Sequence, residues 1–343
     1  MYKKVLLVFL IAVKTTFAFG QWQNLNLNQN VLSTYEIGDR IFAGTSSGIY
    51  YRLENDPNWI LASGISTKAT SFTSSGTTLY VSSYEKLYNS IDNGSTWQAM
   101  PTVYAFQDIN NIAINGNNFI IGMNGSGIYF SSDSGNSWLS SDTSWQSRNT
   151  GIVKKGDFYF SSSESSGYLQ RSTNDTGQQW VTPIGNGLKI EMSTSYQDIK
   201  SLTVLNDEIL IAGTNTAQSF SSYNGVYFSF DNGDNFVKRV NGLSNPSINS
   251  LATIGNVIFA GTDGGGVFYS TDSGLNWNAI NTGLTNLTIN KLYSNQSSLF
   301  ACTSSGLFKI DVCSLLQNSS TISPSGNIEI ANGDTLELKA NLG

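Results

Sequence analysis

The sequence predicts an all-β fold, a seven-bladed β-propeller of four-stranded antiparallel blades, and three observations support this prediction. An eight-residue signature, Ser/Thr-x-Asp-x-Gly-x-x-Trp/Phe, occurs five times. Its aromatic residues recur at a period of roughly 40 residues, the length of one propeller blade. Between the copies, short aromatic and β-branched runs are bounded by Gly, Asn, Asp and Ser, as in strands joined by tight turns, and the mature chain lacks apolar residues at helical spacing. The five copies are Ser90–Trp97, Ser131–Trp138, Thr173–Trp180, Ser229–Phe236 and Ser270–Trp277.

Seven repeat units can be counted, because a degenerate sixth copy ends at Trp59 and a seventh unit follows the last signature. The seventh unit, 299–310, lacks a signature and a final strand of its own. The segment Trp22–Leu25 resembles Trp97–Met100 and Trp277–Ile280. We therefore expect the N-terminal segment to supply the missing strand and close the ring, which removes exposed sheet edges.

The signature residues are better suited to forming a tight turn than to catalysis or metal binding. An Asp side chain can accept backbone N–H bonds across a turn, Gly adopts a backbone conformation that other residues resist, and the aromatic residue packs between blades. Each copy brings one acid, whereas a Ca²⁺ loop needs several oxygen ligands close together. We therefore expect a structural role and no metal for Asp92, Gly94, Trp97, Asp133, Gly135, Trp138, Asp175, Gly177, Trp180, Asp231, Gly233, Phe236, Asp272, Gly274 and Trp277.

The octapeptide resembles the Asp-box (BNR) repeat of sialidases, xyloglucanase-type glycosidases, sortilin-type receptors and photosystem II assembly-factor propellers. The resemblance covers about residues 22–311. It implies that each signature lies on the turn between the third and fourth strands of a blade. The motif is specific for the fold and poorly specific for an activity, since propellers carry many functions.

The two ends of the chain differ from the repeat. Residues 1–20 have Lys3-Lys4, a nine-residue apolar core followed by Lys14, and Ala18–Gly20 before Gln21, which predicts a secretory signal peptide and a secreted or cell-surface protein. The predicted propeller covers 21–312 and a linker covers 313–320. Residues 321–343 alternate apolar and polar positions around Asn332-Gly333, and they resemble the start of an Ig-like β domain in exported Bacteroidetes-type proteins. We expect further domains after residue 343; the alternative for 321–343 is a flexible tail.

The composition restricts the partners. Without the three lysines of the predicted signal peptide, 15 basic residues face 24 acidic ones, which argues against nucleic acid and anionic membrane surfaces. Nothing after the signal peptide is long and apolar enough for a transmembrane span. Two cysteines, Cys302 and Cys313, leave open either one disulfide or two free thiols.

Most catalytic chemistries are excluded by residue type. The chain has no histidine, which removes Ser-His-Asp and Cys-His systems and every His-dependent metal site. No phosphate-binding Gly-rich loop is present, and we expect no cofactor. Only five arginines are present, and two of them, Arg52 and Arg171, fall on expected third strands, so the three-arginine clamp of sialidases is not expected. The remaining enzymatic alternative is a carboxylate-dependent glycoside hydrolase, sialidase- or xyloglucanase-like, whose candidate acids are Glu164, Glu191 and Asp198.

A binding site is expected on the face opposite the signature turns. The longest loops there are 140–148, 161–166, 183–198 and 214–224, and long loops on a rigid scaffold commonly carry function. Their candidate binding residues are Trp145, Arg148, Lys189, Tyr196, Phe220 and Tyr223. The alternative is that the aromatic residues pack within their own loops. The preferred interpretation is an exported, non-catalytic binding or scaffold module whose partner is a protein or a glycan.

Overall fold

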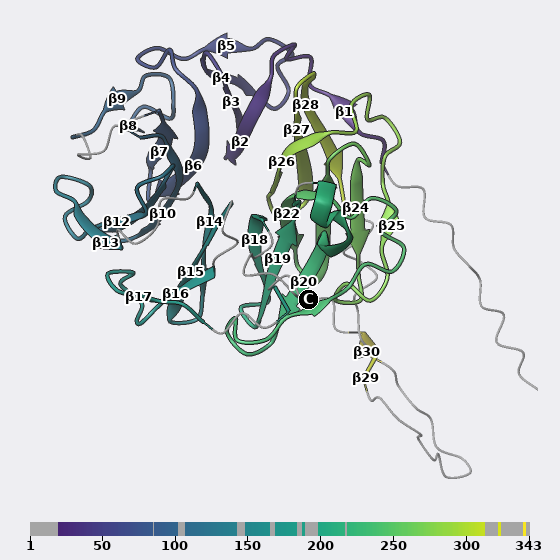
Figure 1. The fold of residues 1–343 in the computed structure, drawn as a ribbon. Helices are drawn as coiled ribbons and strands as arrows, with labels where there is room; N and C mark the ends of the chain where they lie inside the picture. The colour runs from purple at the N-terminus through teal and green to yellow at the C-terminus, as the bar shows by residue number, and fades with distance from the viewer. Residues whose placement is uncertain are drawn as a thin grey trace, which may run out of the picture.

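Seven four-stranded antiparallel sheets surround a central axis, which confirms the predicted propeller (Figure 1). The computed structural model describes residues 20–84, 86–101, 107–142, 148–164, 169–183, 187–188, 198–216, 218–312, 322–323 and 339–340. The innermost strands of neighbouring blades contact one another around the whole ring. The architecture therefore has one continuous inner wall, made of seven parallel-running first strands.

Blades 1 to 6 each use four consecutive strands, ordered from the axis outward. The first three blades are β2 (Val31–Ile37), β3 (Arg40–Thr45), β4 (Gly48–Leu53), β5 (Ile60–Leu61); β6 (Ala69–Ser75), β7 (Thr78–Ser83), β8 (Lys86–Ser90), β9 (Gln98–Ala99); and β10 (Ile109–Asn115), β11 (Asn118–Met123), β12 (Ile128–Ser131), β13 (Leu139–Asp142). The next three are β14 (Asn149–Lys155), β15 (Phe158–Ser163), β16 (Leu169–Ser172), β17 (Trp180–Val181); β18 (Ile199–Leu205), β19 (Ile209–Thr214), β20 (Gly225–Ser229), β21 (Val237–Lys238); and β22 (Ile248–Ile254), β23 (Val257–Thr262), β24 (Val267–Ser270), β25 (Asn278–Ala279).

Blade 7 is closed by the N-terminal segment, as predicted. Strands β26 (Ile289–Ser294), β27 (Ser298–Thr303) and β28 (Gly306–Asp311) are completed by β1 (Gln23–Asn24), which pairs antiparallel with β28. The indole N–H of Trp22 donates to the Ile280 carbonyl of blade 6 at 2.6 Å, and its backbone N–H donates to Thr282 O at 2.9 Å. Trp277 makes the equivalent bonds to Arg239 O and Asn241 O of blade 5. Trp22 thus serves blade 7 as Trp277 serves blade 6.

The hydrophobic core lies between successive blades. Second strands such as β23 are buried along their whole length, because sheets pack against both of their faces, and the sequence shows this as a continuous apolar run. One large ring in each of several blades is fully buried, as in Phe42, Phe119 and Phe228. The apolar clusters join adjacent blades: the cluster around Phe228 of blade 5 includes Phe268 of blade 6. Stability is therefore distributed over the interfaces between blades.

Few other elements are described. A 3₁₀ helix, η1 (Gln218–Tyr223), lies between β19 and β20, and β29 (Ile322–Ser323) pairs antiparallel with β30 (Lys339–Ala340). No helix in the described ranges is long and apolar enough to cross a membrane. Cys302 is a buried free thiol, while Cys313 and the predicted signal peptide up to residue 19 lie outside the described residues.

Candidate functional site

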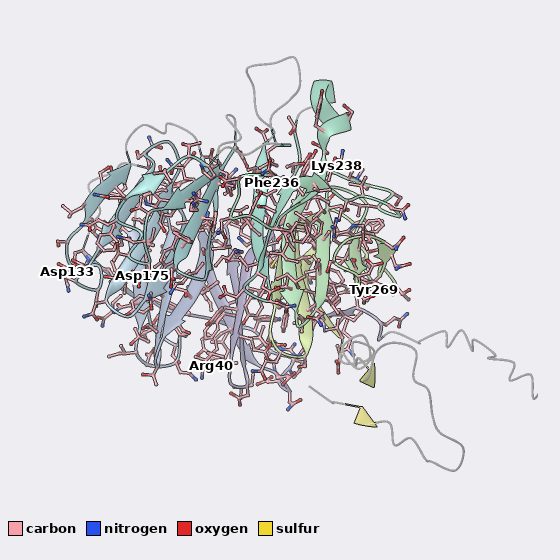
Figure 2. All side chains as sticks on the ribbon, turned by 90° about the horizontal axis from the view of Figure 1, so that it is seen from below. Arg40, Asp133, Asp175, Phe236, Lys238 and Tyr269 are labelled. Atoms are coloured by element: carbon pink, nitrogen blue, oxygen red, sulfur yellow. The ribbon has the colours of Figure 1, made fainter. Side chains whose placement is uncertain are left out.

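The two faces of the ring carry different connections between strands. We call the side that carries the turns between third and fourth strands the turn face, and the opposite side, where first strands begin, the loop face. Arg40, whose guanidinium donates to Asn93 O at 2.6 Å in a turn of blade 2, marks the turn face. Figure 2 shows Arg40 on one side of the ring and η1 projecting from the other. The longer connections, including η1, thus belong to the loop face.

On the turn face, four signature carboxylates accept hydrogen bonds from their own turns. Asp92 Oδ1 accepts the Thr96 backbone N–H at 2.9 Å and its Oδ2 accepts the Thr96 hydroxyl at 2.6 Å. Ser90 Oγ donates to Asp92 and accepts the N–H of Gly94, whose φ of 78° suits glycine. The same contacts recur at Asp133, Asp231 and Asp272. These acids therefore hold the turns together.

The pKa values of two of these carboxyls reflect the same bonds. Hydrogen bonds from the side chain and backbone of Thr96 lower the pKa of Asp92 to about 2, and those from Ser137 lower the pKa of Asp133 to about 2. Donors that favour the charged form of a carboxyl have this effect. A carboxyl with so low a pKa is not suited to donate a proton at neutral pH.

The third copy of the signature, Thr173–Trp180 in blade 4, is built differently from what the motif predicts. Asn174 Oδ1, instead of a carboxylate, accepts the Thr176 N–H at 3.1 Å and the Thr176 hydroxyl at 2.6 Å. In blade 2, Asn89 pairs with Gln98, which places Ser90 opposite Trp97, seven residues later. In blade 4, Ser172 pairs with Trp180, eight residues later. The turn thus has one additional residue, and Ser172, not Thr173, occupies the position of the signature serine. Asp175 lies on this longer turn, between β16 and β17.

On the loop face, a β-bulge recurs in all seven innermost strands. In each blade the register between the first and second strands shifts immediately after the first residue. A bulge re-aims the extra side chain, and bulges are common beside functional sites. We call the seven bulged residues the central ring: Leu32, Thr70, Asn110, Thr150, Lys200, Asn249 and Asn290. All seven line one cavity of about 500 Å³ at the loop-face end of the axis.

Most of the central ring links one blade to the next. Five of its side chains donate a hydrogen bond to the backbone carbonyl of the first inner-strand residue of the following blade. These pairs are Thr70 with Ile109, Asn110 with Asn149, Thr150 with Ile199, Asn249 with Ile289, and Asn290 with Val31, at 2.5–3.1 Å. Leu32 has no donor, and its neighbour Ser33 donates to Ala69 O instead. Lys200 is therefore the one polar member of the central ring that is directed elsewhere.

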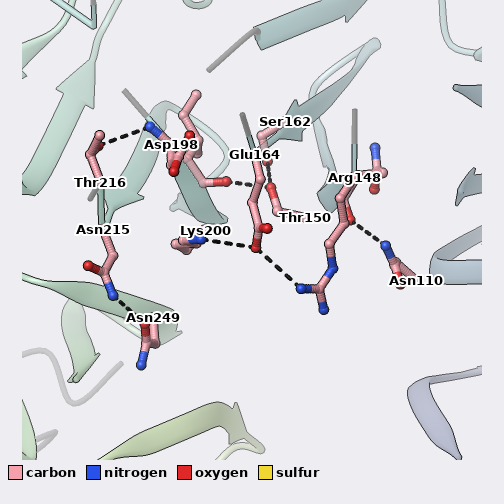
Figure 3. A network of polar contacts seen from close by, with 12 residues as sticks. Asn110, Arg148, Thr150, Ser162, Glu164, Asp198, Lys200, Asn215, Thr216 and Asn249 are labelled. Carbon is pink, nitrogen blue, oxygen red and sulfur yellow. Dashed lines mark hydrogen bonds and ion pairs between the residues drawn. The ribbon is translucent and has the colours of Figure 1, made fainter. Parts of the chain in front are cut away.

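Lys200 belongs to a charged cluster at the cavity wall (Figure 3). Its ammonium lies 3.1 Å from Glu164 Oε1, and Arg148 lies 3.5 Å from the same oxygen. Arg148 and Glu164 face each other because the Glu164 N–H donates to Arg148 O, extending the first hairpin of blade 4 by one pair. Beside them, Asn215 donates to Asn249 at 2.8 Å. The side chain of Glu164 is only 21% exposed and that of Arg148 is 56% exposed, so the arginine can meet an incoming molecule.

The cavity is cationic in an acidic protein. Its described lining includes four cations, Lys68, Arg148, Lys200 and Lys291, and one carboxylate, Glu164. Lys68 also pairs with Asp108. The whole chain has a formal charge of −6. A local excess of positive charge in a hollow attracts anions, since low-dielectric walls focus the field.

The structure brings together only part of the predicted site. Arg148 and Glu164 line the cavity, and Asp198 lies beside it, where its N–H donates to Thr216 Oγ1 at 3.0 Å (Figure 3). Tyr223 ends η1 and is not among the described lining residues. Trp145, Lys189, Glu191, Tyr196 and the side chain of Phe220 lie outside the described residues.

Sequence reasoning missed the central ring. Its signal was present: the second residue of every first strand is polar except Leu32, and it follows a buried residue each time. Recognising it required the bulge, because strict alternation along a strand assigns that residue to the wrong face.

The comparisons with known proteins show the fold. No family model matches the sequence, and no curated protein matches it. Solved structures that resemble it include the extracellular domain of a putative one-component system from B. thetaiotaomicron, with TM-score 0.67, 17% identity, and coverage of 85% of this chain and 40% of that one. YCF48 bound to D1 peptide has TM-score 0.67, 15% identity and coverage of 86% and 98%. The GH74 enzyme of Niastella koreensis has TM-score 0.61, 18% identity and coverage of 85% and 43%. At these identities the similarity establishes the propeller alone.

Proposed function

We propose that this chain is an exported, non-catalytic binding or scaffold module of the Asp-box type, which contacts a protein or a glycan through its loop face. The observation that carries the proposal is the cavity on the propeller axis, to which every blade contributes one bulged side chain. On the turn face, the four signature carboxylates Asp92, Asp133, Asp231 and Asp272 are held by hydrogen bonds within their own turns.

The export part of the proposal rests on the signal-peptide pattern of residues 1–20. Extracellular propeller domains among the similar structures are consistent with it. One similar propeller has a bound peptide and another is a glycoside hydrolase, so both partner classes occur on this fold. The loop residues Trp145, Lys189, Tyr196, Phe220 and Tyr223 remain proposed contacts around the cavity.

The non-catalytic part of the proposal follows from the ion pairs of Glu164. A glycosidase places two carboxyl groups on either side of the scissile bond, and one of them must deliver a proton. The described lining of the cavity has one acid, and a single oxygen of that acid receives both Lys200 and Arg148. This arrangement suits a fixed anion that orients two cations.

The test is a binding screen of the mature full-length chain on glycan and peptide arrays, with reducing-end release measured on every glycan hit. We expect binding without release, and at least about tenfold weaker binding for Arg148→Glu, which reverses a charge at the cavity mouth. The matched control is Lys86→Glu, the same charge change on β8 outside the cavity, which should leave binding unchanged. Release of sugar that disappears in Glu164→Gln would show that the protein is an enzyme. Equal loss in both charge-reversed variants would remove the cavity from the proposal.

A further inference from the structure

Lys291 is the exceptional residue of the cavity. It follows the bulge of β26 and pairs with Cys302 across the strands. The six residues at the same position in the other blades are short: Ser33, Ser71, Asn111, Gly151, Ser201 and Ser250. Lys291 alone extends a charged side chain from this level of the inner wall, and it lines the cavity.

The ammonium of Lys291 has no ion pair or hydrogen bond within the described part of the chain, whereas the other three lining cations each have a carboxylate partner. Burial lowers the pKa of Lys291; the neighbouring Cys302 opposes the lowering and Arg148 adds to it. An uncompensated cation in such a place is unfavourable for folding. Its presence is explained if an anion from outside completes the site.

The rest of the lining indicates what carries the anion. Two hydroxyls and six amide side chains surround the cations: Thr70, Thr150, Asn110, Asn111, Asn149, Asn215, Asn249 and Asn290. Leu32 is the one apolar side chain in the described lining, and no aromatic residue is present there. Peptide-binding hot spots depend on buried aromatic and apolar anchors, which the described lining of the cavity does not offer. Amides and hydroxyls instead match a ligand with many hydroxyl groups.

We propose that the cavity binds a uronate-bearing oligosaccharide, with the sugar carboxylate on the Lys291 ammonium and the hydroxyl groups on the surrounding asparagines. This inference rests on the proposed function, since it names the ligand class for the same loop-face site. Arg148 contributes to the attraction at the mouth of the cavity, where its side chain is accessible. The carboxylate of Glu164 lies close to both Lys200 and Arg148 and reduces the repulsion between these two cations.

The test is calorimetric titration of the mature full-length chain with galacturonate and mannuronate trisaccharides. The comparison ligands are a carboxyl-reduced galacturonate trisaccharide and triglutamate. We expect binding of at least one uronate trisaccharide and at least about tenfold weaker binding of the reduced sugar and of the peptide. Lys291→Gln should weaken uronate binding by about tenfold or more, whereas Lys86→Gln, the control on β8, should not.

Folding and binding can be separated in the same variants. Lys291→Gln removes an unpaired cation and should melt at the same or a higher temperature than the parent protein. Equal binding of the reduced sugar or of triglutamate would overturn the uronate assignment. No binding of either uronate trisaccharide would also overturn it, and the array screen would still decide independently whether the loop face binds another ligand.

Discussion

Trp22→Ala is expected to lower the free energy of unfolding by about 3–5 kcal/mol, the usual cost of truncating a buried tryptophan. Trp22 is 3% exposed and packs in the cluster that joins blades 6 and 7, together with Ile280 and Phe308. Its indole bond to Ile280 O and its backbone bond to Thr282 O both cross between blades. Loss of this anchor releases β1, which exposes the edge of β28. Chemical denaturation followed by far-ultraviolet circular dichroism measures the effect.

Two further variants make this prediction specific. Trp180→Ala removes a half-buried indole that donates to Gly177 O within its own turn, so its loss should be clearly smaller. Trp22→Phe keeps an aromatic ring and loses the donor, for which we expect about 1 kcal/mol. Equal destabilisation by Trp22→Ala and Trp180→Ala would contradict the assignment of Trp22 to ring closure.

Gly64→Ala is expected to destabilise the protein by about 3 kcal/mol or more, through strain and overcrowding together. Gly64 has φ of +91°, and a Cβ built there would lie 1.9 Å from the carbonyl oxygen of Trp97 in the next blade. The position cannot relax easily, because the Trp97 N–H donates to Ser63 O at 2.9 Å and holds the two backbones together. Thermal and chemical denaturation measure the change.

Gly76→Ala is the matched control for Gly64→Ala. Gly76 also has positive φ, +58°, but nothing lies within 4 Å of a Cβ built there. It should therefore show the conformational cost alone, about 1 kcal/mol. If both substitutions cost the same, the close approach between blades 1 and 2 contributes nothing.

The fold was predictable because its signals are local and repeated. The signature octapeptide places a turn in each of five blades, and a repeated short-range signal survives the loss of one copy. The closing strand was predictable from the similarity of Trp22–Leu25 to Trp277–Ile280, although about 260 residues separate the two segments. The additional residue in the turn between Ser172 and Trp180 was not predictable. Thr173 satisfies the signature, and only the strand register distinguishes its position from that of Ser172.

The candidate site was predictable only in part. Arg148 and Glu164 were found because they adjoin long loops, and loop length is visible in a sequence. Lys200 and Lys291 were not found, because they lie inside regular strands, where a charged residue is ordinarily assigned to a solvated face. Their direction depends on the bulge and on the closed ring, which bring residues 68, 148, 200 and 291 to one cavity. That convergence is a property of the whole molecule and of no single segment.

The account depends most on the claim that ligand binds at the axis on the loop face. Amide hydrogen exchange of the mature full-length chain, with and without an array-identified ligand, tests this directly. The account predicts protection at the beginnings of the inner strands, in segments 109–112, 199–202 and 289–292, with no change at the signature turns. Protection confined to the signature turns or to η1, with the inner strands unchanged, would contradict it.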